Sequence, residues 1–156
     1  MTAAIALGSN LPSTFGDREA NLREALRRME TLGRVTAVSS FHDTEPVGYT
    51  EQPRFLNAAA LLETELPPLD LLRGLLEIER QMGRDRATAP AKGPRVIDLD
   101  LLLYGSVVME SEELTLPHPA LHERKFVLAP LAEIAAEMEH PVLRETVGGL
   151  LARLGT

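Results

Sequence analysis

Two aspartates, Asp98 and Asp100, lie two residues apart in the apolar run VIDLDLLLY. The period of a strand places both carboxylates on one face, together with Leu102 and Tyr104. The other face would carry four apolar side chains, Ile97, Leu99, Leu101 and Leu103. Two carboxylates this close repel each other unless a cation neutralises them, and their hard oxygen atoms suit Mg²⁺ bridged to substrate phosphates. The alternative is a solvated pair on an open sheet face, which is the more frequent explanation of an isolated D-x-D pattern.

A basic segment comes directly before the two aspartates. Residues 84–95 contain one acidic residue, Asp85, and four basic ones on a chain whose net charge is −7: Arg84, Arg86, Lys92 and Arg95. The planar guanidinium group of arginine binds phosphate oxygens in pairs. Such a long connection is either a functional loop or a solvated linker. Beside the aspartate pair it favours phosphoryl transfer, which depends on positioning and charge neutralisation.

A strand is predicted at residues 55–63, with Phe55 and Asn57 on the same face. An aromatic ring beside an amide could hold a flat heterocycle, because the ring stacks and the amide recognises donors and acceptors on the edge of the heterocycle. Taken alone, a core phenylalanine and a locally bonded asparagine explain this pair more often. His118, in LTLPHP, could face a phosphate or fill a turn, and the other histidines show no metal-ligand spacing.

Periodicity predicts the elements that position these residues. Strands are predicted at 2–8, 34–42, 55–63 and 96–105, with a weaker strand or turn at 106–109. Amphipathic helices are predicted from about Asp17 to Gly33 and over 66–83, and short helical segments follow Glu123. This order predicts an α+β ferredoxin-like sandwich, a mainly antiparallel sheet with helices on one face and the active site on the other side. Residues 1–156 are expected to form one domain.

Composition excludes several classes of function. With 44% hydrophobic and 25% charged residues the chain has the composition of a globular protein. The absence of cysteine excludes disulfide scaffolds, cysteine-ligated zinc and cysteine nucleophiles. A pI near 5.1 and 4% aromatic residues disfavour a nucleic-acid partner. With no long apolar run, signal peptide or heptad repeat, we expect a cytoplasmic monomer without a membrane partner.

Four common catalytic or nucleotide-binding motifs are absent from the chain: the phosphate-binding GxxxxGKS/T loop, GxGxxG, HExxH and GxSxG. P-loop, Rossmann, zincin and α/β-hydrolase functions therefore lack their sequence signatures.

Seven segments in chain order together resemble a known family. They are IALGSN (5–10), VSSFHDTEPVG (38–48), QPRFLNAA (52–59), EIERQMGR (77–84), GPRVIDLDLLLYG (93–105), LTLPHP (114–119) and ERKFVLAPLAEIA (123–135). This combination is similar to the 6-hydroxymethyl-7,8-dihydropterin pyrophosphokinases of folate biosynthesis. The resemblance implies a ferredoxin-like fold. It also implies transfer of the β,γ-diphosphate of ATP to the hydroxymethyl group of the pterin, with release of AMP.

The resemblance further implies roles for residues at matching positions. Asp98 and Asp100 would bind two Mg²⁺ ions, while Arg84 and Arg95 would neutralise charge during transfer. The pterin pocket would contain Thr44, Pro46, Val47, Gly48, Phe55, Asn57 and Phe126. The ATP side would contain Glu79, Arg86, Thr115, His118 and Arg124.

The chain departs from the family pattern at four positions. Ala91 and Lys92 stand where relatives usually have a basic residue and often a tryptophan before the glycine of GPR. Glu113 replaces an arginine of some relatives near ATP, and Leu76 replaces a polar contact to adenine. These differences affect the expected closure of the basic loop and the affinity for ATP more than the metal site.

The predicted activity is Mg²⁺-dependent diphosphate transfer by in-line attack of the substrate hydroxyl on the β-phosphorus of ATP. Three alternatives stay open from the sequence. The first is a ferredoxin-like module that binds a nucleotide or pterin without chemistry. The second is an enzyme that transfers a single phosphate and releases ADP. The third is a nucleic-acid-binding sheet, which the acidic pI disfavours.

Overall fold

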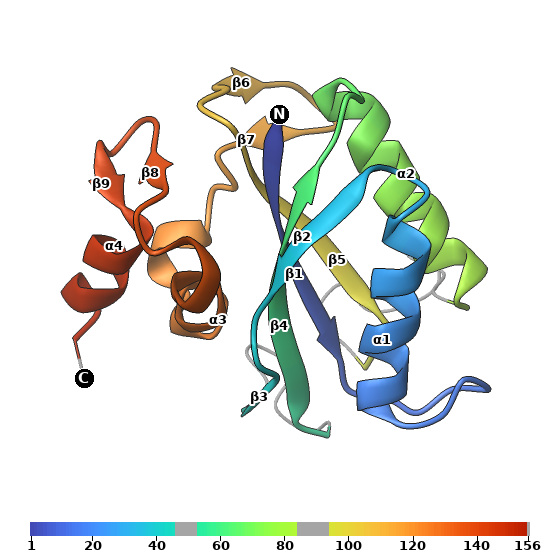
Figure 1. The fold of residues 1–156 in the computed structure, drawn as a ribbon. Helices are drawn as coiled ribbons and strands as arrows, with labels where there is room; N and C mark the ends of the chain where they lie inside the picture. Colours follow the sequence, from blue (N-terminus) through green and yellow to red (C-terminus); the bar gives the residue numbers. More distant parts are fainter. Residues whose placement is uncertain (46–52, 84–93, 156) are drawn as a thin grey trace.

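The computed structural model describes residues 1–45, 53–83 and 94–155, and its main element is a five-stranded antiparallel sheet (Figure 1). The strands are β1 (Thr2–Ser9), β2 (Arg34–Val38), β3 (His42–Thr44), β4 (Phe55–Glu63) and β5 (Asp98–Tyr104). The strand order is β2–β4–β1–β5, and β3 pairs with β4 on the same edge as β2. The central strand β1 therefore pairs with β4 on one side and with β5 on the other.

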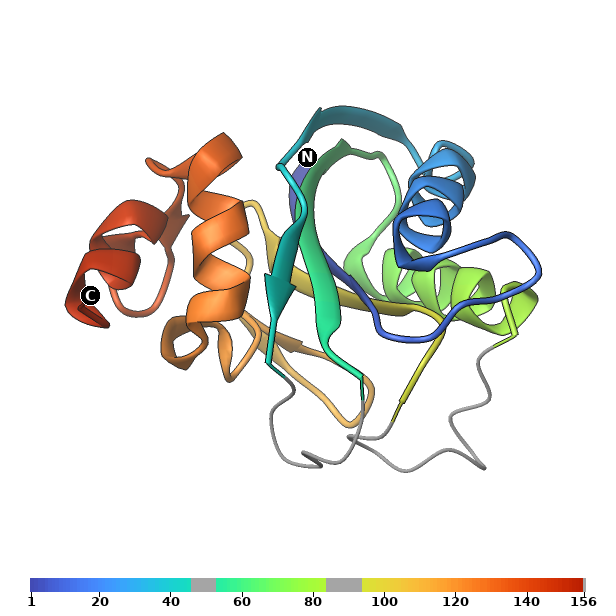
Figure 2. The same cartoon turned by 90° about the horizontal axis from the view of Figure 1, so that it is seen from below.

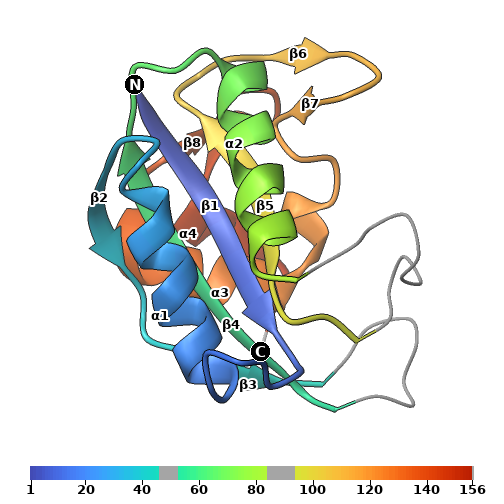
Figure 3. The ribbon, with the colours of Figure 1, turned by 90° about the vertical axis from the view of Figure 1, so that its right-hand side faces the viewer.

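Two helices, α1 (Arg18–Met29) and α2 (Pro68–Gln81), cover the first face of the sheet (Figures 1 and 3). Helix α1 begins where the Asp17 side chain accepts a hydrogen bond from the Ala20 N–H, and α2 begins with a proline at its first position. The larger core lies between these helices and the sheet. Its fully buried side chains include Ile5, Leu7, Leu22, Leu62, Leu71 and Leu75.

The C-terminal part packs on the second face of the sheet. Helix α3 (Lys125–Ala135) lies against β4, and α4 (Val147–Arg153) packs on α3. Figure 2 shows the resulting layers, with the sheet between α3 and the pair α1 and α2. A second core forms here from Ala4, Ala59, Leu102, Leu128 and Leu131. The remaining short elements are β6 (Met109–Glu110), β7 (Thr115–Leu116), a 3₁₀ turn at Leu121–Glu123, β8 (Glu139–His140) and β9 (Glu145–Thr146).

The α+β class and the antiparallel sheet are confirmed, but the second face is free only in part. The sequence predicted helices on one face alone, whereas α3 covers the β4 side of the other face because Leu128 and Leu131 are buried against it. The uncovered remainder of that face carries the candidate site. None of the helices in the described part of the chain is long and apolar enough to cross a membrane.

Two details of the strands differ from the periodic pattern. The strand predicted at 34–42 is interrupted between β2 and β3, because the Ser40 N–H donates to the Glu133 carboxylate and not to a neighbouring strand. In β5, a register shift opposite Ala4 and Ile5 adds one residue. Such a bulge inverts the alternation beyond it, so Leu103 joins the second core and Tyr104 the first. The sequence prediction for these two side chains is therefore wrong.

A polar cluster holds α3 against the edge of the sheet. The Glu133 carboxylate accepts hydrogen bonds from Ser40 N at 2.8 Å and from Ser40 Oγ at 2.8 and 2.9 Å, and it contacts His42 Nε2 at 2.5 Å. The Ser40 backbone bond, then the Ser40 and His42 side chains, lower the pKa of Glu133 below its usual value. The cluster fixes α3 relative to β3, and thereby the position of the first turn of α3.

We expect Glu133→Gln to destabilise the protein at pH 7 by less than about 1 kcal/mol, the range of partly exposed ion pairs. A carboxyl whose pKa is lowered by folding stabilises the native state above its unfolded value of 4.5, and that contribution is lost as pH falls below it. Urea denaturation at pH 7 and pH 3 should therefore show a difference from wild type that shrinks in acid. Glu137→Gln, at an exposed position just after α3, is the control. An equal effect of both substitutions would contradict a specific role for the cluster.

Candidate active site

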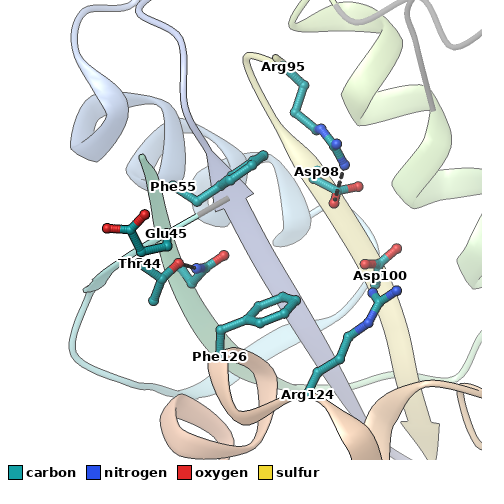
Figure 4. Close-up of a pocket in the computed structure, with 9 residues that line it drawn as sticks. Thr44, Glu45, Phe55, Arg95, Asp98, Asp100, Arg124 and Phe126 are labelled. Carbon is teal, nitrogen blue, oxygen red and sulfur yellow. Dashed lines mark hydrogen bonds and ion pairs between the residues drawn. The ribbon is translucent and has the colours of Figure 1, made fainter. Parts of the chain in front are cut away.

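A pocket lies on the part of the second sheet face that α3 leaves uncovered (Figure 4). The lining residues come from β3, β4, β5 and the start of α3, and from positions up to three residues before or after these elements: Thr44, Glu45, Phe55, Asn57, Arg95, Asp98, Asp100, Arg124 and Phe126. Eight of these nine residues are among those singled out in the sequence, and Glu45 is the exception. Segments that are far apart along the chain therefore meet in one cavity.

The central strand leaves space on the floor of this pocket. Gly8 pairs with Asn57 of β4 on one side and with Asp98 of β5 on the other. A Cβ atom at Gly8 would lie only 3.0 Å from Asn57 Oδ1 and 3.7 Å from Phe55 Cδ1. The glycine thus keeps the space between the amide and the carboxylate open. The sequence alone does not point to Gly8, because its two partners depend on the pairing of strands.

One side of the pocket is aromatic and contains an amide. Phe55 extends into the pocket from β4 and Phe126 from the first turn of α3 (Figure 4). The Asn57 amide nitrogen donates a hydrogen bond to the Thr44 hydroxyl, which leaves the amide oxygen turned towards Gly8. Two aromatic rings and an oriented amide are suited to a flat, polar heterocycle.

The other side of the pocket is charged. Asp98 and Asp100 lie on the same face of β5, as the strand period predicted (Figure 4). Arg95 Nη1 forms an ion pair with Asp98 Oδ2 at 3.1 Å, and the side chains of the pair are only 12% and 21% exposed. The Arg95 guanidinium also lies 5.1 Å from the centre of the Phe55 ring. Arg95 therefore contacts both sides of the pocket, at the point where they meet.

The two aspartates fit magnesium better than a metal held by protein side chains alone. The described residues contain no group of three or more His, Asp or Glu side chains that could hold a metal ion. Asp98 and Asp100 would supply two carboxylate ligands, and the remaining positions would belong to water or to phosphate oxygens. This division of ligands is typical of Mg²⁺ at phosphate-transfer sites.

A second cavity adjoins the first and shares Asp100 with it. Its lining includes Thr115 and His118, two of the residues predicted for the ATP side, and also Leu76 and Glu113. Burial lowers the pKa of His118, and the charge of Arg124 lowers it further, so the imidazole is neutral at pH 7. His118 Nδ1 accepts a hydrogen bond from Ala120 N at 3.1 Å, which places the ring proton on Nε2. His118 can therefore donate a hydrogen bond to an anion.

Glu113, which lines the second cavity, and Arg124, which lines the first, have different electrostatic surroundings. Glu113 forms an ion pair with Arg73 at 2.8 Å, and this contact lowers the pKa of Glu113. Its negative charge is thus balanced on the surface. Arg124 precedes α3, lines the first pocket and lies 5.7 Å from the Phe126 ring.

Glu79 lies behind β5 and not among the lining residues of either cavity. The residue is 2% exposed, and its Oε2 accepts a hydrogen bond from Leu99 N at 2.7 Å. Leu99 stands between the two aspartates on an edge strand, so Glu79 attaches that strand to α2. A direct contact of Glu79 with ATP stays a prediction from the resemblance.

Some predicted positions lie outside the described residues. They are Pro46, Val47, Gly48, Arg84 and Arg86, together with Ala91 and Lys92 of the family comparison.

Glu45 is the one lining residue that the sequence did not predict. It directly follows β3 and forms an ion pair with Arg54 at 2.5 Å. No local pattern marks Glu45, because only the pairing of β3 with β4 brings it to the pocket.

Comparison with known proteins identifies the family of the chain. The family model described as 7,8-dihydro-6-hydroxymethylpterin-pyrophosphokinase (HPPK) matches residues 4–136. The 2-amino-4-hydroxy-6-hydroxymethyldihydropteridine pyrophosphokinase of Bacillus subtilis is 48% identical over 139 residues, which cover 88% of this chain and 80% of that protein. The protein of the same name from Haemophilus influenzae is 44% identical over 141 residues, covering 90% and 86%.

Longer proteins also contain a similar region. A folate synthesis bifunctional protein of Arabidopsis thaliana is 48% identical over 131 residues, which cover 83% of this chain but 26% of that protein. The crystal structure of wild-type Plasmodium falciparum HPPK-DHPS superposes with a TM-score of 0.76 at 16% identity, covering 97% of this chain and 44% of that one. The structural match confirms the fold, and the sequence matches confirm the relationship. The chain therefore belongs to the 7,8-dihydro-6-hydroxymethylpterin-pyrophosphokinase family.

Proposed function

We propose that this protein transfers the β,γ-diphosphate of ATP to the hydroxymethyl group of 6-hydroxymethyl-7,8-dihydropterin and releases AMP. The observation that carries the proposal is the two-sided pocket. Phe55, Asn57 and Phe126 lie on one side, while Asp98 and Asp100 lie on the other. A pterin has a flat ring with hydrogen-bonding edges, and ATP has a polyanionic chain, so each substrate matches one side.

The aromatic side would bind the pterin ring. Phe55 and Phe126 reach the pocket from different elements and offer two apolar faces to a flat ligand. Asn57 would recognise donor and acceptor atoms on the edge of the ring. Thr44 orients the Asn57 amide through their hydrogen bond. The backbone at Pro46, Val47 and Gly48 would complete this pocket according to the resemblance.

The charged side would bind the triphosphate. Asp98 and Asp100 would hold Mg²⁺, with two ions expected from the resemblance, and a bound ion supplies charge neutralisation on the phosphate oxygens. Arg95 and Arg124 add two guanidinium groups to the same pocket. The adjoining cavity with Thr115 and His118 would hold the nucleoside end of ATP, since it continues from Asp100. Arg84 and Arg86 are further candidates for contacts with phosphate.

The position of Arg95 links the two sides during transfer. The pterin hydroxyl oxygen forms a bond to the β-phosphorus as the bond from that phosphorus to the oxygen retained by AMP breaks, and the hydroxyl proton is released. Negative charge then develops on AMP. Arg95 lies between Phe55 and Asp98, so its guanidinium is placed where the hydroxymethyl group would meet the phosphates. His118, whose Nε2 carries a proton, would donate a hydrogen bond where the nucleoside end of ATP joins its phosphates.

The products of one incubation distinguish this activity from its alternatives. The purified protein is mixed with ATP, Mg²⁺ and 6-hydroxymethyl-7,8-dihydropterin, and the nucleotides are separated by chromatography. We expect AMP in amounts equal to the diphosphorylated pterin, and only when pterin is present. ADP would instead show transfer of a single phosphate. Saturable binding without any product would show a binding module and contradict the proposal.

Asp98→Asn and Asp100→Asn should each lower Mg²⁺-dependent turnover by about 10³-fold or more, because each removes a charged ligand from the proposed metal site. Titration of turnover with Mg²⁺ should also show a higher half-saturating concentration. The pterin affinity measured by calorimetry without nucleotide should change little. Asp70→Asn, at an exposed position on α2, is the matched control. Turnover within tenfold of wild type in both aspartate variants would exclude the metal assignment.

Phe55→Ala and Phe126→Ala should each raise the Kd for the pterin by about 10-fold to 100-fold, the effect of losing a stacking partner worth ~1–3 kcal/mol. The Kd for a non-hydrolysable ATP analogue should stay within about threefold of wild type. Phe41→Ala is the control, since Phe41 packs against the first core and does not line the pocket. A larger loss of nucleotide affinity than of pterin affinity would contradict the assignment of the two sides.

A further inference from the structure

The turn after β1 contains a buried asparagine, Asn10, that connects two other segments of the chain. Its side chain is almost fully buried, with a residue exposure of 1%. Asn10 Oδ1 accepts a hydrogen bond from Arg95 N at 2.7 Å, and Asn10 Nδ2 donates one to Pro53 O at 3.0 Å. The backbone N–H of Asn10 also donates to Arg95 O at 3.1 Å. One residue therefore holds both backbone polar groups of Arg95 and the carbonyl of Pro53.

These two partners lead to opposite sides of the candidate active site. Arg95 carries the guanidinium that contacts Asp98 and lies over the Phe55 ring. Pro53 lies two residues before Phe55, at the entrance to β4. Asn10 itself follows Gly8, which forms the floor between Asn57 and Asp98. The Asn10 amide is thus bonded to the segment that leads to Phe55 on the aromatic side and to the segment that leads to Asp98 on the charged side.

We infer that Asn10 is a positioning residue for the diphosphate transfer. Through the Arg95 backbone it sets where the Arg95 guanidinium stands relative to the ring-binding residues. Through Pro53 it sets where Phe55 stands relative to β1. The inference rests on the proposed function, because the distance between the two sides matters only if both substrates bind there. Asn10 is not among the lining residues of the pocket.

The chemistry of the side chain explains why an asparagine stands here. An amide carries an acceptor oxygen and an NH2 donor group on the same carbon, and Asn10 accepts from an N–H with its oxygen and donates to a carbonyl with its nitrogen. Aspartate would keep the acceptor but place a carboxylate oxygen against the Pro53 carbonyl. Alanine would remove these bonds and leave buried polar groups of the backbone without this partner. The two substitutions therefore remove different parts of the connection.

A second buried asparagine provides a matched control. Asn21 is fully buried, donates to Leu11 O at 2.8 Å and to Ser9 Oγ at 3.2 Å, and accepts from Ser13 Oγ at 2.5 Å. The partners of these hydrogen bonds all lie in the turn of residues 9–13, which Asn21 attaches to α1. Asn21→Ala should therefore destabilise the same turn without releasing Arg95 or Pro53.

The test compares Asn10→Ala, Asn10→Asp and Asn21→Ala in the full chain. Urea denaturation measures the loss of stability, and chemical quench measures AMP released in a single turnover with saturating ATP and with enzyme in excess over the pterin. We expect Asn10→Ala to slow the single-turnover rate by 30-fold or more, and Asn21→Ala to leave it within threefold of wild type at a similar loss of stability. Equal rates in the two alanine variants would overturn the inference, because the role of Asn10 would then be structural only.

Asn10→Asp distinguishes the contact of Asn10 with Arg95 from its contact with Pro53. Asn10→Asp should keep the contact with Arg95 and lose the contact with Pro53. We therefore expect it to weaken pterin binding by tenfold or more, while the Kd for a non-hydrolysable ATP analogue changes less than threefold. Equal effects on the affinities for both ligands, or no effect on either, would contradict the assignment of the Pro53 contact to pterin binding.

A readout without catalysis keeps this inference distinct from the proposed function. Hydrogen exchange of the Arg95 amide, followed by NMR, should accelerate at least tenfold in Asn10→Ala but not in Asn10→Asp or Asn21→Ala. If wild type releases no AMP, the proposed function fails on its own evidence, and the exchange and pterin-binding data still decide whether Asn10 holds the two sides. Unchanged exchange in Asn10→Ala would overturn the inference even in an active enzyme.

Discussion

The pairing of β1 with both β4 and β5 is the constraint on which the site depends. Gly8 lies between Asn57 and Asp98 in the register of the sheet, so two interstrand spacings, roughly 10 Å, separate the backbones of these two residues. A ring bound on one side and a phosphate bound on the other can then meet over the central strand. Gly8 and Ala6 have little or no side chain, and the space above β1 is therefore available to ligands.

The sheet supplies only part of the pocket, and α3 supplies the rest. Arg124 and Phe126 enter at the start of this helix, and its position depends on the buried Leu128 and on the contacts of Glu133 with the sheet edge. The packing that covers half of the second face thus also builds a wall of the site. A fully open face would leave Phe55 without a second aromatic ring opposite the charged residues.

The sequence predicted those features that depend on local period, and it missed those that depend on pairing. The alternation of a strand places Asp98 with Asp100, and Phe55 with Asn57, and the structure confirms both faces. The alternation fails at Leu103 and Tyr104, because the bulge arises from pairing with β1. Phe126 came from family resemblance, since no local pattern relates α3 to a strand 70 residues earlier. Glu79, buried against Leu99, likewise owes its place to the packing of α2.

The Arg95–Asp98 pair explains why the backbone of Arg95 needs a fixed position. Asp98 is the ligand expected for a cation, so binding of a metal and a polyphosphate changes the charges around this ion pair. A guanidinium has five N–H donors and can move from a carboxylate to phosphate oxygens by rotation of its side chain alone. That rotation brings the guanidinium to the phosphate oxygens only if the main chain of Arg95 stays in place. Asn10 holds the Arg95 N–H and C=O, so in the proposed reaction such a rearrangement would be confined to the Arg95 guanidinium group.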